Sequence, residues 1–359
     1  MRVLVVSTPV GSLGSGQGGG VEITLSSLVA GLLERGHQLT VLAGEGSVLP
    51  PRCARAELWT VAGVDQPSWQ HQPREAAVQI PTGSLLSQLW RRVLKEQSQF
   101  DLILNLGYDW LPLWLTPSTS TPLAHLVSMG SVSLAMDQVI AEVSQGYPDH
   151  LAFHTAAQAA DFQLSQPPIL LGNGFDLHRY RFNPSPDAQL GWAGRIAPEK
   201  GLEDAAAAAA QLGLPLVVMG LAADPAYAAR VEASVPAGTI RWRGFLTTDA
   251  LQAELGRCRA LLNTPKWNEA FGNVVVEAMA CGVPVASYRR GGPSELIQEG
   301  LNGALADPDA VTSLVAAAQR AMALERQDCR HWAEQHGSIE RFAERVEGWL
   351  QTLLKARSC

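Results

Sequence analysis

Charged residues are scarce in this chain. Of its 359 residues, 17% are Asp, Glu, Lys or Arg, and the formal net charge is −7, whereas about 25% of an average globular protein is charged. A partner with a long phosphate backbone needs clustered Lys and Arg, so nucleic acid is excluded as the main partner. A small anionic ligand is not excluded, because a few local cations can bind a phosphate on an acidic protein.

Metal-binding and disulfide patterns are also missing. The five cysteines are widely spaced without a CxxC pair, and the eight histidines show no HExxH spacing. Neither a zinc cage nor a disulfide scaffold is expected, and we predict no metal and no required cofactor. No run approaches about 18 apolar residues, and residues 3–6 are too short for a signal-peptide core. We therefore expect a cytoplasmic protein without a transmembrane segment. The sequence does not determine its oligomeric state.

Short β-branched runs alternate with longer helical stretches, which predicts α/β domains with parallel sheets. With 33 glycines, 22 prolines and 47% hydrophobic residues, the chain is neither a disordered tail nor a coiled coil. Residues 167–174 (PPILLGNG) combine prolines, a short apolar run and a Gly-Asn-Gly turn, as a domain boundary would. We predict doubly wound domains at 1–171 and 172–338 and a terminal helix at 339–359.

The expected strands are residues 3–6, 39–43, 57–60, 102–104, 123–127, 151–153, 190–193, 214–219, 239–242, 260–263 and 283–286. The expected helices are residues 21–34, 84–97, 131–143, 156–164, 202–212, 225–234, 248–256, 271–281 and 293–299, and the chain is nearly all helical in pattern from residue 309.

The first motif is the glycine-rich run GSGQGGG at residues 14–20, between the first expected strand and helix. It satisfies GxGxxG literally. In the dinucleotide fingerprint, however, the first glycine follows the strand almost at once and an acid lies about 20 residues further on. Here several residues intervene, and Glu45 is the only acid near the end of the second strand. A loop whose bare backbone approaches a phosphate or sugar is favoured over a flexible surface loop.

The second motif, GRIAPEKG at residues 194–201, directly follows an expected strand. Ligands of open α/β sheets bind beyond the carboxyl ends of the strands, where Arg195 and Lys200 start a turn. The planar guanidinium and the compact ammonium suit a diphosphate. Alternatively, Lys200 pairs with Glu199 or Glu203 at a solvated helix start.

The third motif, NEAFGNVVVEAMACGVPV at residues 268–285, is the most specific. Glu269 lies in the loop, and Glu277 lies inside the following helix among apolar and small residues. Buried acids need donors, and a vicinal diol supplies two to one carboxylate. The helix start adds N–H groups and positive dipole toward an anion. The alternatives are an internal salt bridge for Glu277 and an ordinary first-turn acid for Glu269.

Together with GGPSE at residues 291–295, these motifs resemble the retaining glycosyltransferases of family four, which have the GT-B fold. The resemblance covers almost the whole chain and is strongest in the C-terminal half; GNGFD at 172–176 resembles the family's boundary motif. It implies two Rossmann-like, doubly wound parallel-sheet domains that face a central cleft. The first would bind the acceptor and the second the nucleotide sugar, with the last helix crossing back to the first domain.

The resemblance also implies roles at individual positions. Arg195 and Lys200 would hold the donor diphosphate, Glu277 the ribose hydroxyls, and Glu269 a hydroxyl of the hexose. Further donor contacts are implied for Phe271, Gly272, Asn273, Val274, Val275, Arg243, Gly244, Phe245, Gly18, Gly19 and Gly20. Family membership implies retention at the anomeric carbon, and the cations can stabilise the leaving diphosphate without a metal.

The chain departs from the family at one position. Many members carry a histidine just after the fifth strand of the first domain, facing the donor sugar. Alignment from Pro122 places Ser128 there, whereas His125 lies inside the strand. Both residues are candidates on the acceptor side, and a hydrogen-bonded core histidine is the alternative for His125.

The opening residues 6–22 resemble cyanobacterial UDP-glucose:tetrahydrobiopterin glucosyltransferases, which implies UDP-glucose as donor and a reduced pterin as acceptor. The tryptophans of the first half that could stack on such a ring are Trp69, Trp90, Trp110 and Trp114, with packing as the alternative for each. Glu22 and Asp109 are candidate acceptor-side carboxylates, although Glu22 could instead stabilise its helix through the dipole.

Three functions therefore stand open. The favoured one is a nucleotide-sugar glycosyltransferase that acts on a pterin, or on a sugar or lipid. The glycine-rich run alone would suit a nicotinamide-dependent oxidoreductase. A protein that binds a nucleotide sugar without turnover is the third.

Overall fold

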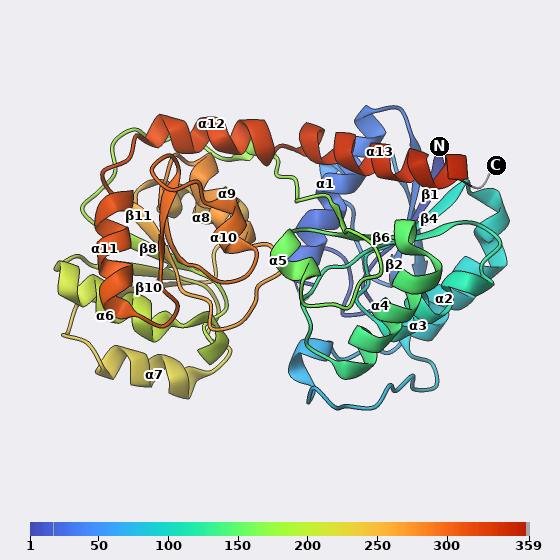
Figure 1. Ribbon diagram of the computed structural model, residues 1–359, viewed down its shortest axis with the longest axis horizontal. Helices are drawn as coiled ribbons and strands as arrows, with labels where there is room; N and C mark the ends of the chain where they lie inside the picture. Colours follow the sequence, from blue (N-terminus) through green and yellow to red (C-terminus); the bar gives the residue numbers. More distant parts are fainter. Residues whose placement is uncertain (17, 357–359) are drawn as a thin grey trace. The chain divides into compact units, whose positions relative to one another are not determined.

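The computed structural model describes residues 1–16 and 18–356 and divides the chain into two compact units (Figure 1). Unit 1 consists of Met1–Gly174 and the C-terminal helix that begins at Ile339, and unit 2 consists of Phe175–Ser338. The first division falls at the end of the segment 167–174.

In the described part of unit 1, seven parallel strands have the order β3-β2-β1-β4-β5-β6-β7. They are β1 (Arg2–Val6), β2 (Gln38–Gly44), β3 (Glu57–Val61), β4 (Leu102–Asn105), β5 (Leu123–Leu126), β6 (Leu151–Phe153) and β7 (Ile169–Leu170). The helices are α1 (Gly20–Glu34), α2 (Leu85–Glu96), α3 (Trp110–Trp114), α4 (Leu134–Gly146), α5 (Ala156–Ala159) and α13 (Ile339–Ala356).

Unit 2 contains a six-stranded parallel sheet in the order β10-β9-β8-β11-β12-β13 over its described residues. The strands are β8 (Leu190–Ala193), β9 (Leu216–Met219), β10 (Ile240–Gly244), β11 (Ala260–Asn263), β12 (Val285–Tyr288) and β13 (Gly303–Ala306). The helices are α6 (Leu202–Leu212), α7 (Pro225–Ala233), α8 (Thr248–Gly256), α9 (Asn273–Ala280), α10 (Pro293–Leu296), α11 (Val311–Ala321) and α12 (Arg326–His336).

The predicted fold class, two doubly wound parallel sheets, is confirmed. In each sheet the first strand lies between the second and the fourth of its series, so the strand order reverses there. Ligands of such sheets bind beyond the carboxyl ends of the strands at this switch point. The fold therefore points to the loop after β1 in unit 1 and to the loop after β8 in unit 2.

Several elements differ from the pattern-based expectation; among them, α3 (Trp110–Trp114) was not expected, and the helix expected over 293–299 ends at Leu296. β13 was not expected, because Gly303–Ala306 (GALA) carries no β-branched residue, yet every residue of it is buried. The helix expected from residue 131 begins at Leu134, where the Ser133 side chain caps it. The helix expected over 156–164 ends at Ala159.

Helices α1 and α13 lie side by side in unit 1 (Figure 1). Leu28 of α1 and Phe342 and Val346 of α13 are fully buried in one core. At the crossing, a Cβ on Gly31 would lie 2.5 Å from Cβ of Ala343, closer than side chains tolerate. Only glycine permits this approach, and the contact packs the last helix closely against α1.

Small side chains shape the core of unit 2. Helix α6 presents buried alanines to the sheet and to α11, which itself contributes buried alanines; they are Ala205, Ala206, Ala208, Ala209, Ala317, Ala318 and Ala321. Alanine favours the helix and permits close packing. The alanine-rich sequence of α6 therefore has a structural reason.

Candidate functional site

The loop after β8 is built for a tight turn. A 3₁₀ turn (Pro198–Lys200) leads to Gly201, whose φ is 64°. A Cβ there would lie 2.1 Å from the carbonyl oxygen of Thr264, so only glycine fits. Thr264 Oγ1 donates a hydrogen bond to the Gly201 carbonyl at 2.8 Å. This bond ties the loop to the end of the neighbouring strand β11.

Lys200 and Glu269 come together in this loop. Lys200 Nζ donates to Glu269 Oε2 at 2.9 Å, and the two side chains are 20% and 19% exposed. The same ammonium lies 5.3 Å from the centroid of the Trp267 ring, a cation–π distance. Lys200 therefore pairs with Glu269 rather than with Glu199 or Glu203. An ammonium has further N–H donors, which a bound anion could use.

The two glycines of the GGPSE motif, Gly291 and Gly292, lie against the backbone of Glu269. Gly292 N donates to the Glu269 carbonyl at 2.7 Å. A Cβ on Gly291, whose φ is 60°, would lie 2.6 Å from Glu269 N. The pair of glycines thus lets two backbone segments touch and sets the position of the carboxylate.

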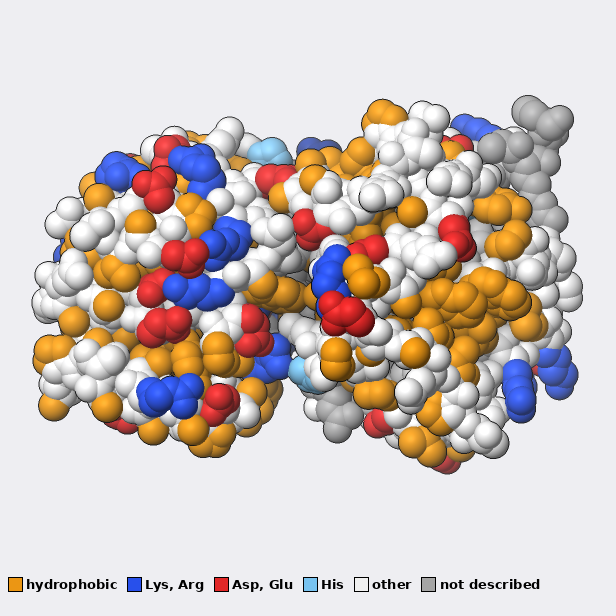
Figure 2. All heavy atoms as spheres, turned by 60° about the horizontal axis from the view of Figure 1, so that its bottom comes forward, with side chains coloured by type: hydrophobic (Ala, Val, Ile, Leu, Met, Phe, Trp, Pro, Cys, Tyr) orange, Lys and Arg blue, Asp and Glu red, His pale blue; other side chains and the backbone are white. Residues whose placement is uncertain are grey.

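Arg195 bonds to Glu199, four residues along the same turn, and each side chain is about one-third exposed at 32%. A phosphate at this guanidinium would compete with Glu199. Figure 2 shows the same pattern over the face it draws: Lys and Arg side chains are interspersed with Asp and Glu. Arg195 and Lys200 are each balanced by a nearby carboxylate.

Glu277 is buried in α9, with 6% of the residue exposed. Tyr180 Oη donates to Glu277 Oε1 at 2.8 Å. Its bonded partner is thus a hydroxyl rather than the cation of an internal salt bridge. Burial raises the pKa of Glu277, and the Tyr180 hydrogen bond opposes this only in part. Tyr180 was not predicted as a partner of Glu277, because the two residues are 97 positions apart in the sequence.

Helix α9 begins at Asn273, between Glu269 and Glu277 in the sequence. Its cap, Gly272, has φ 94°, and a Cβ there would lie 2.7 Å from Pro293 Cγ. Phe271 is buried and stacks on Phe175 with centroids 6.4 Å apart. Asn273 and Val274 in the first turn are half-buried, as is suitable for residues beside a ligand.

The segment that follows β10 presents an aromatic side chain to solvent. Phe245 is 68% exposed. Before it, Gly244 has φ 67°, and Arg243 Nε lies 3.4 Å from Glu254 Oε2. These three residues stand at the carboxyl edge of the unit 2 sheet, where the resemblance puts the nucleobase.

In unit 1, Glu22 holds the glycine-rich loop. Its two carboxylate oxygens accept from Gly14 N and Gly18 N, each at 2.8 Å. Gly19 caps α1 with φ 56°, and Gly20 is the first residue of that helix. A pyrophosphate on the Gly14 and Gly18 amides would meet this carboxylate. The geometry therefore disfavours the dinucleotide hypothesis and makes Glu22 a residue that shapes the loop.

Asp109 caps the short helix α3. Its Oδ1 accepts from Trp110 N at 2.7 Å, and the residue is 2% exposed. Burial raises the pKa of Asp109 to about 6, while Trp110 N–H and the Trp69 indole lower it in part. This carboxyl follows β4, at the same edge of the sheet as the glycine-rich loop.

His125 is a core histidine, as the alternative reading allowed. Thr116 Oγ1 donates to the Leu113 carbonyl at 2.6 Å and lies 2.9 Å from His125 Nε2, so Nε2 carries the proton. Nδ1 then accepts from Asn105 Nδ2 at 3.2 Å. Burial lowers the pKa of His125 to about 3. By contrast, Ser128 Oγ is buried without a hydrogen-bond partner among the described residues.

The tryptophans divide into packing and exposed residues. Trp90 is 2% exposed and belongs to the core beneath the sheet. Trp69 is also buried. Trp110 and Trp114 stack with centroids 5.5 Å apart, and Trp114 is 51% exposed. Of these candidates, the stacked pair presents an aromatic surface.

Residues 1–16 and 18–356 contain no group of three or more His, Cys, Asp or Glu placed to hold a metal ion. The Asp-x-Asp tripeptide that ends at Asp309 is engaged otherwise, because Asp309 pairs with Arg290 and with Lys266. Among the same residues, no helix combines the length and apolarity of a membrane crossing.

Comparison with known proteins finds a family model that resembles unit 2. Residues 178–338 match the model of the family "Glycosyl transferases group 1", and this match spans nearly all of the unit. A GDP-mannose-dependent alpha-mannosyltransferase of Mycolicibacterium smegmatis is 36% identical over 146 residues, 38% of this chain and 37% of the relative. A D-inositol 3-phosphate glycosyltransferase of Segniliparus rotundus is 28% identical over 58% of this chain and 51% of the relative. The chain thus spans about half or less of these relatives.

Solved structures match over the whole chain. Sucrose-phosphate synthase from Thermosynechococcus elongatus has a TM-score of 0.76 at 18% identity and covers 99% of this chain and 100% of its own. Anabaena HepE in complex with UDP-glucose has a TM-score of 0.74 at 19% identity, covering 98% and 100%. At these identities the likeness shows the fold, which is GT-B.

Proposed function

We propose, from the match of residues 178–338 to the group 1 glycosyl transferase model, that this chain transfers glucose from UDP-glucose to a small acceptor with retention at the anomeric carbon. The observation that carries the proposal is the Lys200–Glu269 pair at the carboxyl edge of the unit 2 sheet. Glu277 lies buried on the helix that follows. A cation and an acid at this edge, with a second acid buried on the next helix, suit a nucleoside diphosphate sugar.

Each donor group has a proposed partner. Lys200 and Arg195 bind the diphosphate, and Glu277 accepts hydrogen bonds from the ribose hydroxyls. Glu269, already held by the Gly291–Gly292 turn, accepts from a hydroxyl of the hexose. The exposed ring of Phe245 offers a stacking surface for the base. The Anabaena protein of the same fold was solved with UDP-glucose, which supports this choice of donor.

The chemistry follows from where charge develops. When the bond between the anomeric carbon and the phosphate oxygen breaks, negative charge grows on the leaving diphosphate. Lys200, Arg195 and the N–H groups at the start of α9 are preorganised to stabilise it, and no metal is required in this scheme. The acceptor attacks from the face that the diphosphate leaves, and its proton passes to the departing phosphate.

For the acceptor we propose a reduced pterin. The opening residues 6–22 carry this proposal, and two features of unit 1 support it. The stacked Trp110–Trp114 pair includes a half-exposed ring, which suits a flat heterocycle. Asp109, with its raised pKa, stands at the same edge of the sheet. A sugar or lipid acceptor is the runner-up.

The test is a transfer assay read by mass spectrometry. UDP-glucose and GDP-mannose are each offered with tetrahydrobiopterin, simple sugars and a lipid, with and without EDTA. We expect a pterin mass increased by one hexose from UDP-glucose, unchanged by EDTA. Binding of UDP-glucose without turnover of any acceptor would make the chain a sensor. Strict dependence on added Mg²⁺ would overturn the role given to the cations.

A further inference from the structure

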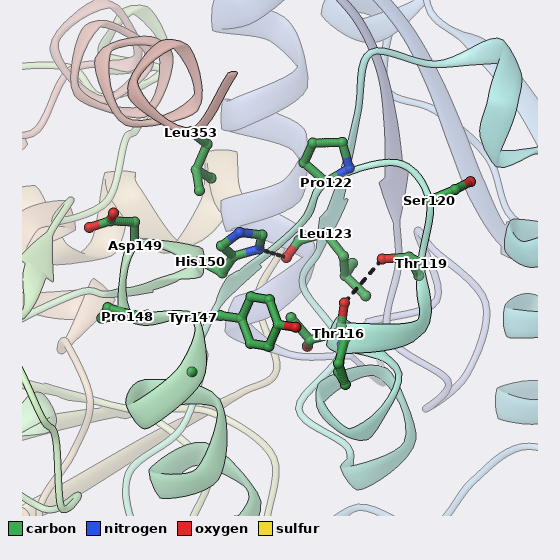
Figure 3. Close-up of a pocket in the computed structure, with 12 residues that line it drawn as sticks. Thr116, Thr119, Ser120, Pro122, Leu123, Tyr147, Pro148, Asp149, His150 and Leu353 are labelled. Carbon is green, nitrogen blue, oxygen red and sulfur yellow. Dashed lines mark hydrogen bonds between the residues drawn. The ribbon is translucent and has the colours of Figure 1, made fainter. Parts of the chain in front are cut away.

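A cavity of about 410 Å³ opens in unit 1 (Figure 3). Its walls include Leu123, the first residue of β5, and His150, the residue before β6. It therefore lies at the amino ends of the strands, whereas the glycine-rich loop and Asp109 lie at the carboxyl ends. Leu353 of α13 closes one side.

Three polar groups in this cavity have unused hydrogen-bonding capacity. His150 Nδ1 lies 2.8 Å from the Leu123 carbonyl, which can only accept, so Nδ1 holds the proton. Burial lowers the pKa of His150, so the ring is neutral and Nε2 is an acceptor. Among the described residues, His150 Nε2, the Asp149 carboxylate and Tyr147 Oη have no hydrogen-bond partner.

The aromatic surface of the cavity is also available. The Tyr147 ring meets the His150 ring edge-on, with centroids 5.4 Å apart, and Tyr147 is 37% exposed. Figure 3 shows Tyr147 and His150 side by side, with Leu353 and Pro122 across from them. The walls thus combine aromatic rings and apolar side chains with hydrogen-bond acceptors.

The lining residues determine the class of ligand. Among the described residues, the lining contains no Lys or Arg, and Asp149 adds negative charge, so a phosphate or other anion is disfavoured. Two acceptors, a phenol and an apolar ring face suit a neutral molecule with several hydroxyls and a C–H face. A pocket of this size matches a small ligand.

We propose that this cavity is a second binding site, for a neutral mono- or disaccharide, in which Asp149 and His150 accept from sugar hydroxyls and the Tyr147 ring packs on the sugar. The proposal is independent of the donor site in unit 2 and of the transfer reaction. It therefore stands or falls separately from the proposed function.

The experiment is saturation-transfer NMR on the full chain with methyl α-glucoside and maltose, and titration of any binding sugar. Saturating UDP is present throughout to occupy the donor site. We expect saturation transfer to at least one of the two sugars, and at least a tenfold rise in its Kd for Asp149→Ala and for Tyr147→Ala. The matched control is Glu142→Ala, an exposed acid on the same helix as the cavity rim but outside the lining, which should bind as wild type does.

Tyr147→Phe separates the ring from the hydroxyl, because it keeps the packing surface and should lose less affinity than Tyr147→Ala. Circular dichroism checks that each variant is folded. Three outcomes would overturn the proposal: neither sugar binds, UDP abolishes the binding, or Asp149→Ala and Tyr147→Ala bind as tightly as Glu142→Ala.

Discussion

The two units have the same strand order up to their sixth strand but opposite charge at equivalent loops. After β8, unit 2 carries Arg195 and Lys200 on a turn that Gly201 closes. After β1, unit 1 carries a glycine-rich loop held by the Glu22 carboxylate. The fold supplies a ligand edge in each unit, and the side chains decide that an anion suits unit 2 and is disfavoured in unit 1.

The buried and partly buried acids of the two units differ in their bonding partners. Glu277 in unit 2 accepts from a tyrosine hydroxyl, and Glu269 is neutralised by an ammonium. Asp109 in unit 1 accepts from a backbone N–H at the start of α3. Burial raises the pKa of both Glu277 and Asp109, so the two units differ in what the acids bond to: a tyrosine hydroxyl and an ammonium in unit 2, a backbone N–H in unit 1.

The largest effect on activity is expected at Lys200, because the loop after β1 in unit 1 carries no cation. Lys200→Ala should lower kcat for transfer from UDP-glucose about 100- to 1,000-fold, or about 3–4 kcal/mol, because a preorganised cation at the leaving group is lost. Steady-state kinetics measure this. Lys95→Ala, at a site 74% exposed in unit 1, is the control and should be neutral. A loss below tenfold would remove Lys200 from the reaction.

The next effect concerns stability in unit 1. The pKa of Asp109 rises from 3.8 to about 6 on folding. Its contribution to stability is therefore fully present below pH 3.8 and lost as the pH rises through 6, a change of about 3 kcal/mol. Asp109→Asn keeps the helix cap without this loss, so relative to wild type it should gain stability between pH 4.5 and 7.5.

Urea unfolding at the two pH values measures that gain. The matched control is Asp224→Asn, in which the replaced carboxylate caps α7 of unit 2 at a partly exposed position. Its effect on the free energy of unfolding should differ less between the two pH values. An equal pH dependence in both variants would mean that burial of Asp109 is not the cause.

A smaller effect is expected at the ribose position of unit 2. Glu277→Gln should raise the Kd of UDP about tenfold, or about 1.4 kcal/mol, because a neutral amide binds the hydroxyls less strongly. Since burial raises the pKa of Glu277, wild-type affinity should fall as the pH drops, while the variant should change little. Calorimetry measures both, with the exposed Glu232→Gln as control. An unchanged Kd would contradict the ribose role.

The comparison of the two units also shows which features could be predicted from the sequence. Parallel strands and their helices follow from local periodicity, so the fold class and most of the element positions were predictable. Lys200 and Glu269 lie in the loops that follow the neighbouring strands β8 and β11, so topology brings them to one edge. The partner of Glu277 is Tyr180, and that of His125 is Thr116; these contacts depend on tertiary packing. Likewise, nothing local indicates that Glu22 reaches back to Gly14.

The smallest effect should appear in the glycine-rich loop of unit 1. Glu22→Gln keeps one oxygen acceptor but loses the second and the charge, so one of the two amide bonds at Gly14 and Gly18 is lost and the loop loosens. The loop is exposed, so the cost is modest; we expect about a threefold rise in KM for UDP-glucose. The Kd of UDP, which lacks the sugar, should stay within error, because the proposed nucleotide contacts are all in unit 2. Glu45→Gln, an exposed acid of unit 1, is the control. If Glu22→Gln weakened UDP as much as UDP-glucose, the loop would contribute to nucleotide binding and the contrast between the two units would fail.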